Sequence, residues 1–207
     1  MKTALQLYQK YYVDREYEGL DLFQLLRDQY GVQSALYPGS FVHVTPSFVF
    51  PVTAYVDSDR QAKRAFGDPE LLQLIRQRQE YDQDPQVVFY AADYTTPFGA
   101  QDESFDLLVS QYAGLISRSC KRYLRIGGLL LANNSHGDAG IAALDPDYRL
   151  AAVTDRCRGR YRVSESNLDA YFIPKKQGQN TSEIIEQLGR GIAYTKTATS
   201  YLFRRVR

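Results

Sequence analysis

Apolar residues alternate along the chain between short continuous runs and segments with helical spacing. The continuous runs are rich in β-branched and aromatic residues and predict strands, at 34–40, 52–59, 86–93, 105–114 and 129–134. The segments between them carry helical periodicity or capping residues. Five strands separated by helices predict an α/β fold, a doubly wound and mostly parallel sheet with right-handed crossovers and helices on both faces.

Local signals define the expected helix ends. We expect caps at Asp21, at Thr45 before Pro46, at Asp59, at Asp68 before Pro69, and at Thr181 or Ser182. Gly31 is suited to follow the first of these helices. Gly127 is expected to end a helix whose last turns hold Arg118, Lys121, Arg122 and Arg125, because positive charge complements the helix dipole there.

Three further expectations concern strands. The run at 86–93 is continuous enough for a strand buried on both faces, and the run at 34–40 is expected to pair in parallel with 52–59. After residue 134 the runs at 148–155 and 198–206 are strand-like, and we expect them to pair antiparallel.

Composition places the chain among folded globular proteins. It has 207 residues, 44% of them hydrophobic and 24% charged, which argues against disorder and low complexity. Cys120 and Cys157 are too few for a disulfide framework or a four-cysteine zinc site. No apolar stretch approaches the length of a membrane span. We therefore expect a cytoplasmic protein with no membrane partner and no metal.

Charge is unevenly distributed although the net charge is only +1. Residues 156–207 contain eleven basic and four acidic residues. One interpretation is that this basic segment is neutralised in the fold. The other is that it attracts an anionic substrate or nucleic acid, with Arg160, Lys175 and Lys176 exposed near the mouth of a cleft.

Ligands of open parallel sheets bind beyond the carboxyl ends of the strands. That rule selects Tyr37, Gly39, Ser40, Asp57, Asp59, Asp93, Tyr94, Gln111 and Tyr112. Asp57 lies about 20 residues beyond the first turn, where a carboxylate can accept from both hydroxyls of a ribose. Asp93 could accept from the amino group of an adenine. The alternative for Asp59 and Asp68 is purely helix capping.

The loop 133–140 offers the best candidate for proton transfer. His136 could take a proton from a nucleophile, with Asp138 orienting the imidazole. Asn134 is a candidate substrate contact in the same loop. The alternative is a polar surface turn, because Asn, Ser and Asp satisfy local backbone groups. Before the first strand, a group of tyrosines could form a lid over a cleft: Tyr8, Tyr11, Tyr12 and Tyr17.

The order of LYPGS, YVDSD, AADY, FDLLVSQYAG and GGLLLANNSHGD resembles class I S-adenosylmethionine-dependent methyltransferases over roughly residues 34–138. It looks most like poorly characterised methyltransferase-like bacterial proteins with YPGS at the first turn. The resemblance implies a Rossmann-like sheet of seven strands with the last antiparallel. It implies one domain over 1–207, with a helical cap at 1–33, a nucleotide-binding core at 34–138 and carboxyl-terminal strands and a basic segment at 139–207.

The resemblance also implies a function. Gly39 stands at the first glycine of the nucleotide loop, Asp57 or Asp59 at the ribose-binding acid, and Asp93 at the adenine-contacting acid. S-adenosylmethionine is then the cofactor, and the partner is a small or medium-sized molecule that accepts a methyl group. Lys175 and Lys176, with Tyr112 and Asn134, are expected to contact that acceptor.

The chain departs from the family pattern at Phe41, where a second glycine is expected, since a ring there fills space that glycine leaves open. A second hypothesis is therefore a non-catalytic binding or interaction protein on the same scaffold. A third is a nucleic-acid-binding module that uses the basic segment; against it, SQYAG follows the fourth strand in place of the NPPY motif of amino-methylating enzymes.

Overall fold

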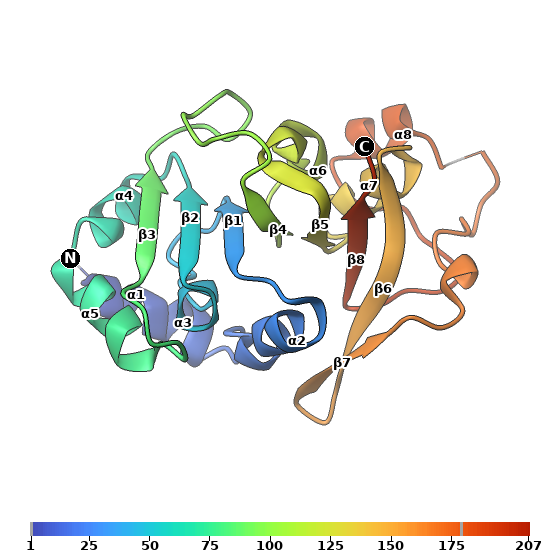
Figure 1. Ribbon diagram of the computed structural model, residues 1–207. Coiled ribbons are helices and arrows are strands. Elements are labelled where there is room, and N and C mark those ends of the chain that lie inside the picture. The colour runs from blue at the N-terminus through green and yellow to red at the C-terminus, as the bar shows by residue number, and fades with distance from the viewer. Residues whose placement is uncertain (1, 179) are drawn as a thin grey trace. The chain divides into compact units, whose positions relative to one another are not determined.

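The computed structural model describes residues 2–178 and 180–207. It divides into two compact units, unit 1 (Met1–Phe98) and unit 2 (Gly99–Arg207). Both units are of α/β type, with helices around the strands (Figure 1). The division into sections 1–33, 34–138 and 139–207 within a single domain stays a prediction.

Three parallel strands form the sheet of unit 1. They are β1 (Ser34–Pro38), β2 (Val52–Val56) and β3 (Gln86–Tyr90). β2 lies between the other two and pairs in parallel with both, which confirms the expected pairing of the first two runs. In β1 and β2 every residue after the first is buried, as continuous apolar strands require. The three arrows point the same way, so their carboxyl ends share one edge (Figure 1).

Helices occupy the crossovers of unit 1. They are α1 (Ala4–Tyr8), the π-helix η1 (Gln9–Val13), α2 (Leu20–Tyr30), α3 (Pro46–Val49), α4 (Arg60–Phe66) and α5 (Pro69–Arg78). The Asp59 and Asp68 side chains accept from backbone N–H groups of the first turns of α4 and α5, as predicted. Asp21 is not the cap of α2, however. Gly19 holds that position in a left-handed conformation, which places Asp21 inside the first turn.

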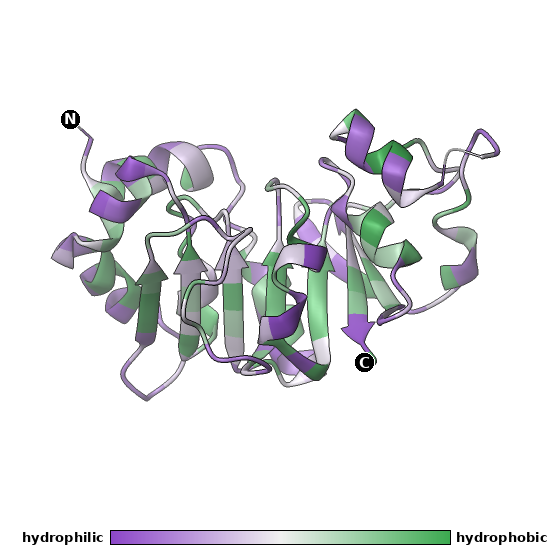
Figure 2. Cartoon of the chain, turned by 90° about the horizontal axis from the view of Figure 1, so that it is seen from above, coloured by the Kyte–Doolittle hydropathy of each residue, from purple (hydrophilic) through white to green (hydrophobic). Residues whose placement is uncertain are grey.

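A mixed set of five strands forms the sheet of unit 2: β4 (Phe105–Ser110), β5 (Leu124–Ala132), β6 (Tyr148–Cys157), β7 (Arg160–Ser164) and β8 (Ser200–Arg205). β4 and β5 are parallel. β8 lies antiparallel between β5 and β6, which confirms both the antiparallel last strand and its pairing with the run at 148–155. Figure 2 shows hydrophobic residues concentrated in the strands and polar ones on outer parts of the helices.

The remaining elements of unit 2 are short: α6 (Ile116–Ser119), the 3-10 helix η2 (Lys121–Tyr123), α7 (Asp138–Leu144), the 3-10 helix η3 (Leu168–Ala170) and α8 (Ser182–Leu188). Thr181, rather than Ser182, caps α8 by accepting from Ile184 N. None of the helices within residues 2–178 and 180–207 combines the length and hydrophobicity needed to cross a bilayer.

Three further expectations about strands and helices are wrong. The described residues form eight strands rather than seven, because β7 returns beside β6 as a hairpin that the sequence pattern did not reveal. β3 is not buried on both faces, since it is an edge strand of the described sheet and Val88 is 46% exposed. Gly127 does not end a helix. It lies within β5 at a φ of 82°, where the β4–β5 register shifts and glycine permits the irregularity.

Candidate functional site

In unit 1 the chain turns sharply where β1 ends. Gly39 has a φ of 65°, and its N–H donates to the Val56 carbonyl at the end of β2. Phe41 also adopts a left-handed conformation, with a φ of 51°. The backbone at this position has the conformation of the expected second glycine, although the residue is phenylalanine. Because phenylalanine has a Cβ, this conformation is strained.

Asp57 stabilises this turn from the end of β2. Its Oδ2 accepts from Phe41 N at 2.8 Å, and its Oδ1 accepts from Asp59 N at 2.8 Å. The side chain is half-buried. A carboxylate offers about four lone-pair positions, so each oxygen retains capacity for one more donor.

The other two acids at strand ends serve local structure. Asp59 caps α4 through Oδ1, which accepts from Gln61 N and Ala62 N. Asp93 lies on the exposed loop after β3, where Oδ1 accepts from both the backbone N–H and the hydroxyl of Thr95. These hydrogen bonds lower the pKa of the Asp93 carboxyl. Tyr94, next to it, is half-buried.

Aromatic residues of the amino-terminal segment lie over the turn. The Tyr12 hydroxyl donates to the Ser40 carbonyl at 3.1 Å, and the Tyr12 ring stacks on His43 with centroids 4.3 Å apart. The Tyr11 ring meets Phe41 edge-on at 5.4 Å. The π-helix supplies both tyrosines, and such helices occur often at functional sites.

A buried polar network anchors this segment. The Tyr8 hydroxyl donates to Glu18 Oε1 at 2.6 Å and accepts from the Thr45 hydroxyl at 2.8 Å. Arg78 Nη1 donates to the same Glu18 oxygen at 2.6 Å, with its guanidinium over the Phe48 ring. Charged and neutral donors thus converge on Glu18, which ties the start of the chain to α3 and α5.

His43 is held in the interior beneath the turn. Its Nε2 lies 3.0 Å from the Glu18 carbonyl, and Nδ1 lies 3.2 Å from the Tyr37 hydroxyl. A carbonyl can only accept, so Nε2 carries the proton and Tyr37 donates to Nδ1. Burial lowers the pKa of His43 to about 4, which keeps the imidazole neutral. Tyr37 and Ser40, which were expected to contact a cofactor, are also buried.

In unit 2 the ends of β4 and β5 are joined by polar side chains. Gln111 donates from Nε2 to the Ser200 hydroxyl, and its Oε1 accepts from Asn133 Nδ2 at 3.1 Å. Tyr112 follows with a φ of 58° and is 66% exposed. Gln111 thus braces the strand ends, while Tyr112 presents its ring to solvent.

The loop after β5 does not pair His136 with Asp138 as expected. Asp138 is buried at the start of α7, where Oδ2 accepts from the Ser110 hydroxyl and Oδ1 from the Ser117 hydroxyl, both at 2.5 Å. Ser117 N also donates to this carboxylate. Burial raises the pKa of Asp138, although these hydrogen bonds oppose the change. His136 is exposed, with Nδ1 3.0 Å from the Ser135 hydroxyl.

Asn134 contributes to packing rather than to an open surface. Its Nδ2 donates to the Ile192 carbonyl at 3.3 Å. A Cβ on Gly191 would lie 2.2 Å from the Asn134 carbonyl oxygen, so this approach requires glycine. The Asn134 Oδ1 is buried without a hydrogen-bond partner among the described residues.

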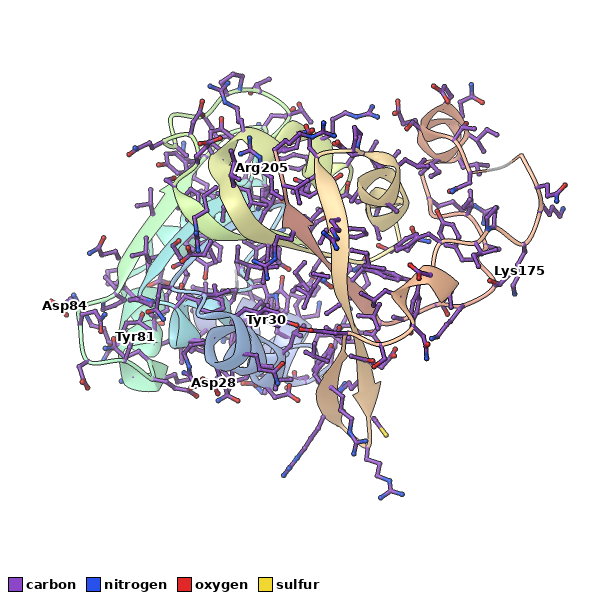
Figure 3. The ribbon with its side chains drawn as sticks, turned by 45° about the vertical axis from the view of Figure 1, so that its right-hand side comes forward. Asp28, Tyr30, Tyr81, Asp84, Lys175 and Arg205 are labelled. Carbon is purple, nitrogen blue, oxygen red and sulfur yellow. The ribbon has the colours of Figure 1, made fainter. Side chains whose placement is uncertain are left out.

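The basic residues of the carboxyl-terminal segment lie on different elements of unit 2. Lys175 and Lys176 are exposed on the loop before α8, and Figure 3 shows Lys175 at the surface. Arg160 is exposed at the start of β7. Elsewhere in unit 2 several cations pair with acids, such as Arg122 with Asp102. The described residues include no group of three His, Cys, Asp or Glu side chains arranged to hold a metal ion.

The sequence does not predict the contacts of Tyr12 with the turn or with His43. No spacing rule connects Tyr12 to a turn 28 residues away. The aromatic richness of the amino terminus was the only available signal.

The sequence matches no protein-family model and no curated protein. Among solved structures it is similar to a methyltransferase from Geobacter sulfurreducens, with 16% identity, coverage of 72% of this chain and 82% of that chain, and a TM-score of 0.45. It is also similar to the O-methyltransferase from Bacillus cereus in complex with SAH, with 13% identity, coverage of 70% and 77%, and a TM-score of 0.45. Likeness at this level assigns neither the fold nor the activity.

Proposed function

We propose that this chain is an S-adenosylmethionine-dependent methyltransferase that binds its cofactor at the carboxyl ends of β1, β2 and β3. The observation that carries the proposal is the pairing of Asp57 with Phe41 N beside the Gly39 turn. It joins a left-handed turn after the first strand to an acid after the second, which is the arrangement that nucleoside binding by a parallel sheet requires.

The residues present fit the adenosine part of this cofactor. Asp57 keeps one lone-pair position on each oxygen for the two ribose hydroxyls, while the same oxygens hold the turn. Asp93 uses Oδ1 for Thr95, and its Oδ2 remains for the adenine amino group. Gly39 lets the backbone approach the ligand closely.

The cofactor would supply an electrophilic methyl group to a nucleophile of the acceptor. The contribution of this chain is then chiefly positioning. Tyr11 and Tyr12 would shield the turn from water. His136 remains the proposed proton acceptor, oriented by Ser135 in place of Asp138. Tyr112, Lys175 and Lys176 remain proposed contacts of an acceptor that is small or medium-sized and anionic.

A second candidate function is ligand binding or protein interaction without methyl transfer. Two observations favour it. Phe41 stands at the left-handed turn position where a glycine is expected, and Asp138 accepts from Ser110 and Ser117 rather than from His136.

Calorimetric titration of the purified chain with S-adenosylmethionine and S-adenosylhomocysteine tests the proposal. We expect both to bind, and Asp57→Asn to weaken binding by about tenfold or more, as removal of a charged hydrogen-bond partner does. Asp59→Asn is the matched control, because asparagine caps a helix as well as aspartate does. Failure of the wild-type protein to bind either compound would contradict the proposal and favour the second candidate. Equal effects of the two variants would remove Asp57 from the site.

A further inference from the structure

The hairpin formed by β6 and β7 carries the densest positive charge of the chain. Residues 156–162 read RCRGRYR, with four arginines and no acid. β6 and β7 pair antiparallel up to Cys157 and Arg160, and only Arg158 and Gly159 connect them. Figure 3 shows this two-stranded ribbon extending away from the other strands of its unit, with long side chains on both sides.

These arginines lie on both faces of the ribbon. Cross-strand partners share a face, and successive residues alternate between faces. Arg156 faces Tyr161 on one side, whereas Arg160 faces Cys157 on the other. Arg162 shares the Arg160 face. A positive ribbon with two charged faces suits a ligand that presents negative charge on two sides.

Three of the four arginines of the ribbon have no acidic partner in the part of the chain that the structure describes. No ion pair is described for Arg158, Arg160 or Arg162 within residues 2–178 and 180–207. Asp155 faces Arg162 across the ladder without forming an ion pair with it, and Asp155 Oδ1 accepts from Thr199 N at 3.0 Å. By contrast, other arginines of unit 2 have acidic partners: Arg118 with Glu186, Arg122 with Asp102, and Arg125 with Asp106.

The tip places arginine where the backbone disfavours it. Arg158 and Gly159 have φ values of 52° and 79°, which match a two-residue turn of type I′. Asparagine, aspartate or glycine adopts this conformation more readily at the first position. Arginine is conformationally unfavourable at this position, and it places a positive charge at the end of the ribbon. A residue that violates a local preference in this way is expected at a functional position.

We infer that the β6–β7 ribbon docks in the major groove of double-stranded DNA. That groove is about 12 Å wide and admits a two-stranded ribbon, and phosphates line both of its walls. Arginines on the two faces reach opposite walls, and Arg158 points toward the base edges. Single-stranded nucleic acid has no groove with two phosphate walls, and the major groove of duplex RNA is too narrow for side chains to enter. This inference is independent of cofactor binding.

Fluorescence anisotropy with a labelled DNA duplex of mixed sequence, measured without S-adenosylmethionine, tests the inference. The test variant is Arg158→Asn with Arg160→Gln and Arg162→Gln, in which asparagine preserves the turn. The control is Arg118→Gln with Arg122→Gln and Arg125→Gln, which removes the same charge from paired arginines. Circular dichroism establishes that both variants are folded.

We expect the wild-type protein and the control to bind with a steep salt dependence. The test variant should bind more weakly, and its slope of log affinity against log salt should be shallower by about 2, since Arg160 and Arg162 would each lose a phosphate contact that contributes roughly 0.9. Duplex DNA should also slow alkylation of Cys157, which is exposed, whereas Cys120 is buried and burial raises its pKa to about 12. Absence of duplex binding, equal losses in both variants, or stronger binding of duplex RNA, single-stranded DNA or polyglutamate would each overturn the inference.

Discussion

The Asp57 carboxylate accepts a hydrogen bond of 2.8 Å from the backbone N–H of Phe41. This contact joins the end of β2 to the turn after β1 and fixes Phe41 in a left-handed conformation. One carboxylate thereby shapes the turn and remains able to accept from a ligand. The geometry of the nucleoside site that we propose therefore depends on an interaction within the protein itself.

Replacing Phe41 by glycine should raise the affinity for S-adenosylmethionine by up to about tenfold, because it removes the ring from the space that the ligand would occupy. Relief of the left-handed strain should instead raise the free energy of unfolding by about 1–2 kcal/mol, since the strain is present in both the free and the bound protein. Phe41→Ala separates these causes, since alanine removes the ring but keeps the Cβ. Calorimetric titration measures both variants. Unchanged or weaker binding in the two variants would mean that the ring is accommodated by the ligand or stacks on it.

Structural features that depend on a few neighbouring residues, such as helix caps, can be predicted from the sequence. Asp59 and Asp68 cap the helices that follow them because a cap depends only on the adjacent backbone. The exposure of β3 could not be predicted in the same way. The run QVVFY is equally hydrophobic whether it forms a central strand or an edge strand, and only the strand order distinguishes them.

The sequence predicts which residues of the candidate site lie at strand ends. It does not predict which residues those side chains contact. The position of Asp57 followed from its distance to the first turn, whereas its bond to Phe41 depends on the register of β1 and β2. The partners of Asp138 come from the end of β4 and from α6, far away in sequence. A short-range interpretation of the loop 133–140 therefore assigned the carboxylate to His136.

Burial of His43 should make stability depend on pH. The pKa of His43 falls to about 4 in the folded protein, below its ordinary value of 6.5. Between these values the unfolded chain binds the additional proton, so stability is complete above about pH 6.5 and declines as the pH falls toward 4, by up to about 3 kcal/mol. Urea unfolding across this range measures the decline. His43→Gln should show a shallower dependence, and an equal slope in both proteins would assign it to other groups.

The anchor of the amino-terminal segment should contribute measurably to stability. Tyr8→Phe removes the hydroxyl that donates to Glu18 and leaves Thr45 without that acceptor, so the free energy of unfolding should fall by about 2 kcal/mol. Tyr11→Phe is the matched control on the same segment, because the Tyr11 hydroxyl meets Lys10 in an exposed contact at 3.5 Å. Urea denaturation compares the two. A similar change in both variants would contradict a specific role for the Tyr8 network.

Replacement of Asp138 and replacement of His136 should have different effects on the free energy of unfolding. The Asp138 carboxylate accepts from Ser110 and from both the hydroxyl and the N–H of Ser117, all of which are buried. Asp138→Asn directs an amide N–H₂ toward these donors and should lower the free energy of unfolding by about 1–3 kcal/mol. His136→Ala should change it by less than about 0.5 kcal/mol, as exposed positions do.

The same pair of variants also distinguishes a structural carboxylate from a catalytic one. Because Asp138 acts on the end of β4 and on α6, the effect of Asp138→Asn should persist when His136 is already alanine, and the two changes should add. If Asp138 oriented the imidazole instead, its replacement in the His136→Ala background would have a smaller effect. Additive losses in urea denaturation of the double variant would therefore assign Asp138 to the fold and leave His136, with Ser135, as the group to be tested for proton transfer.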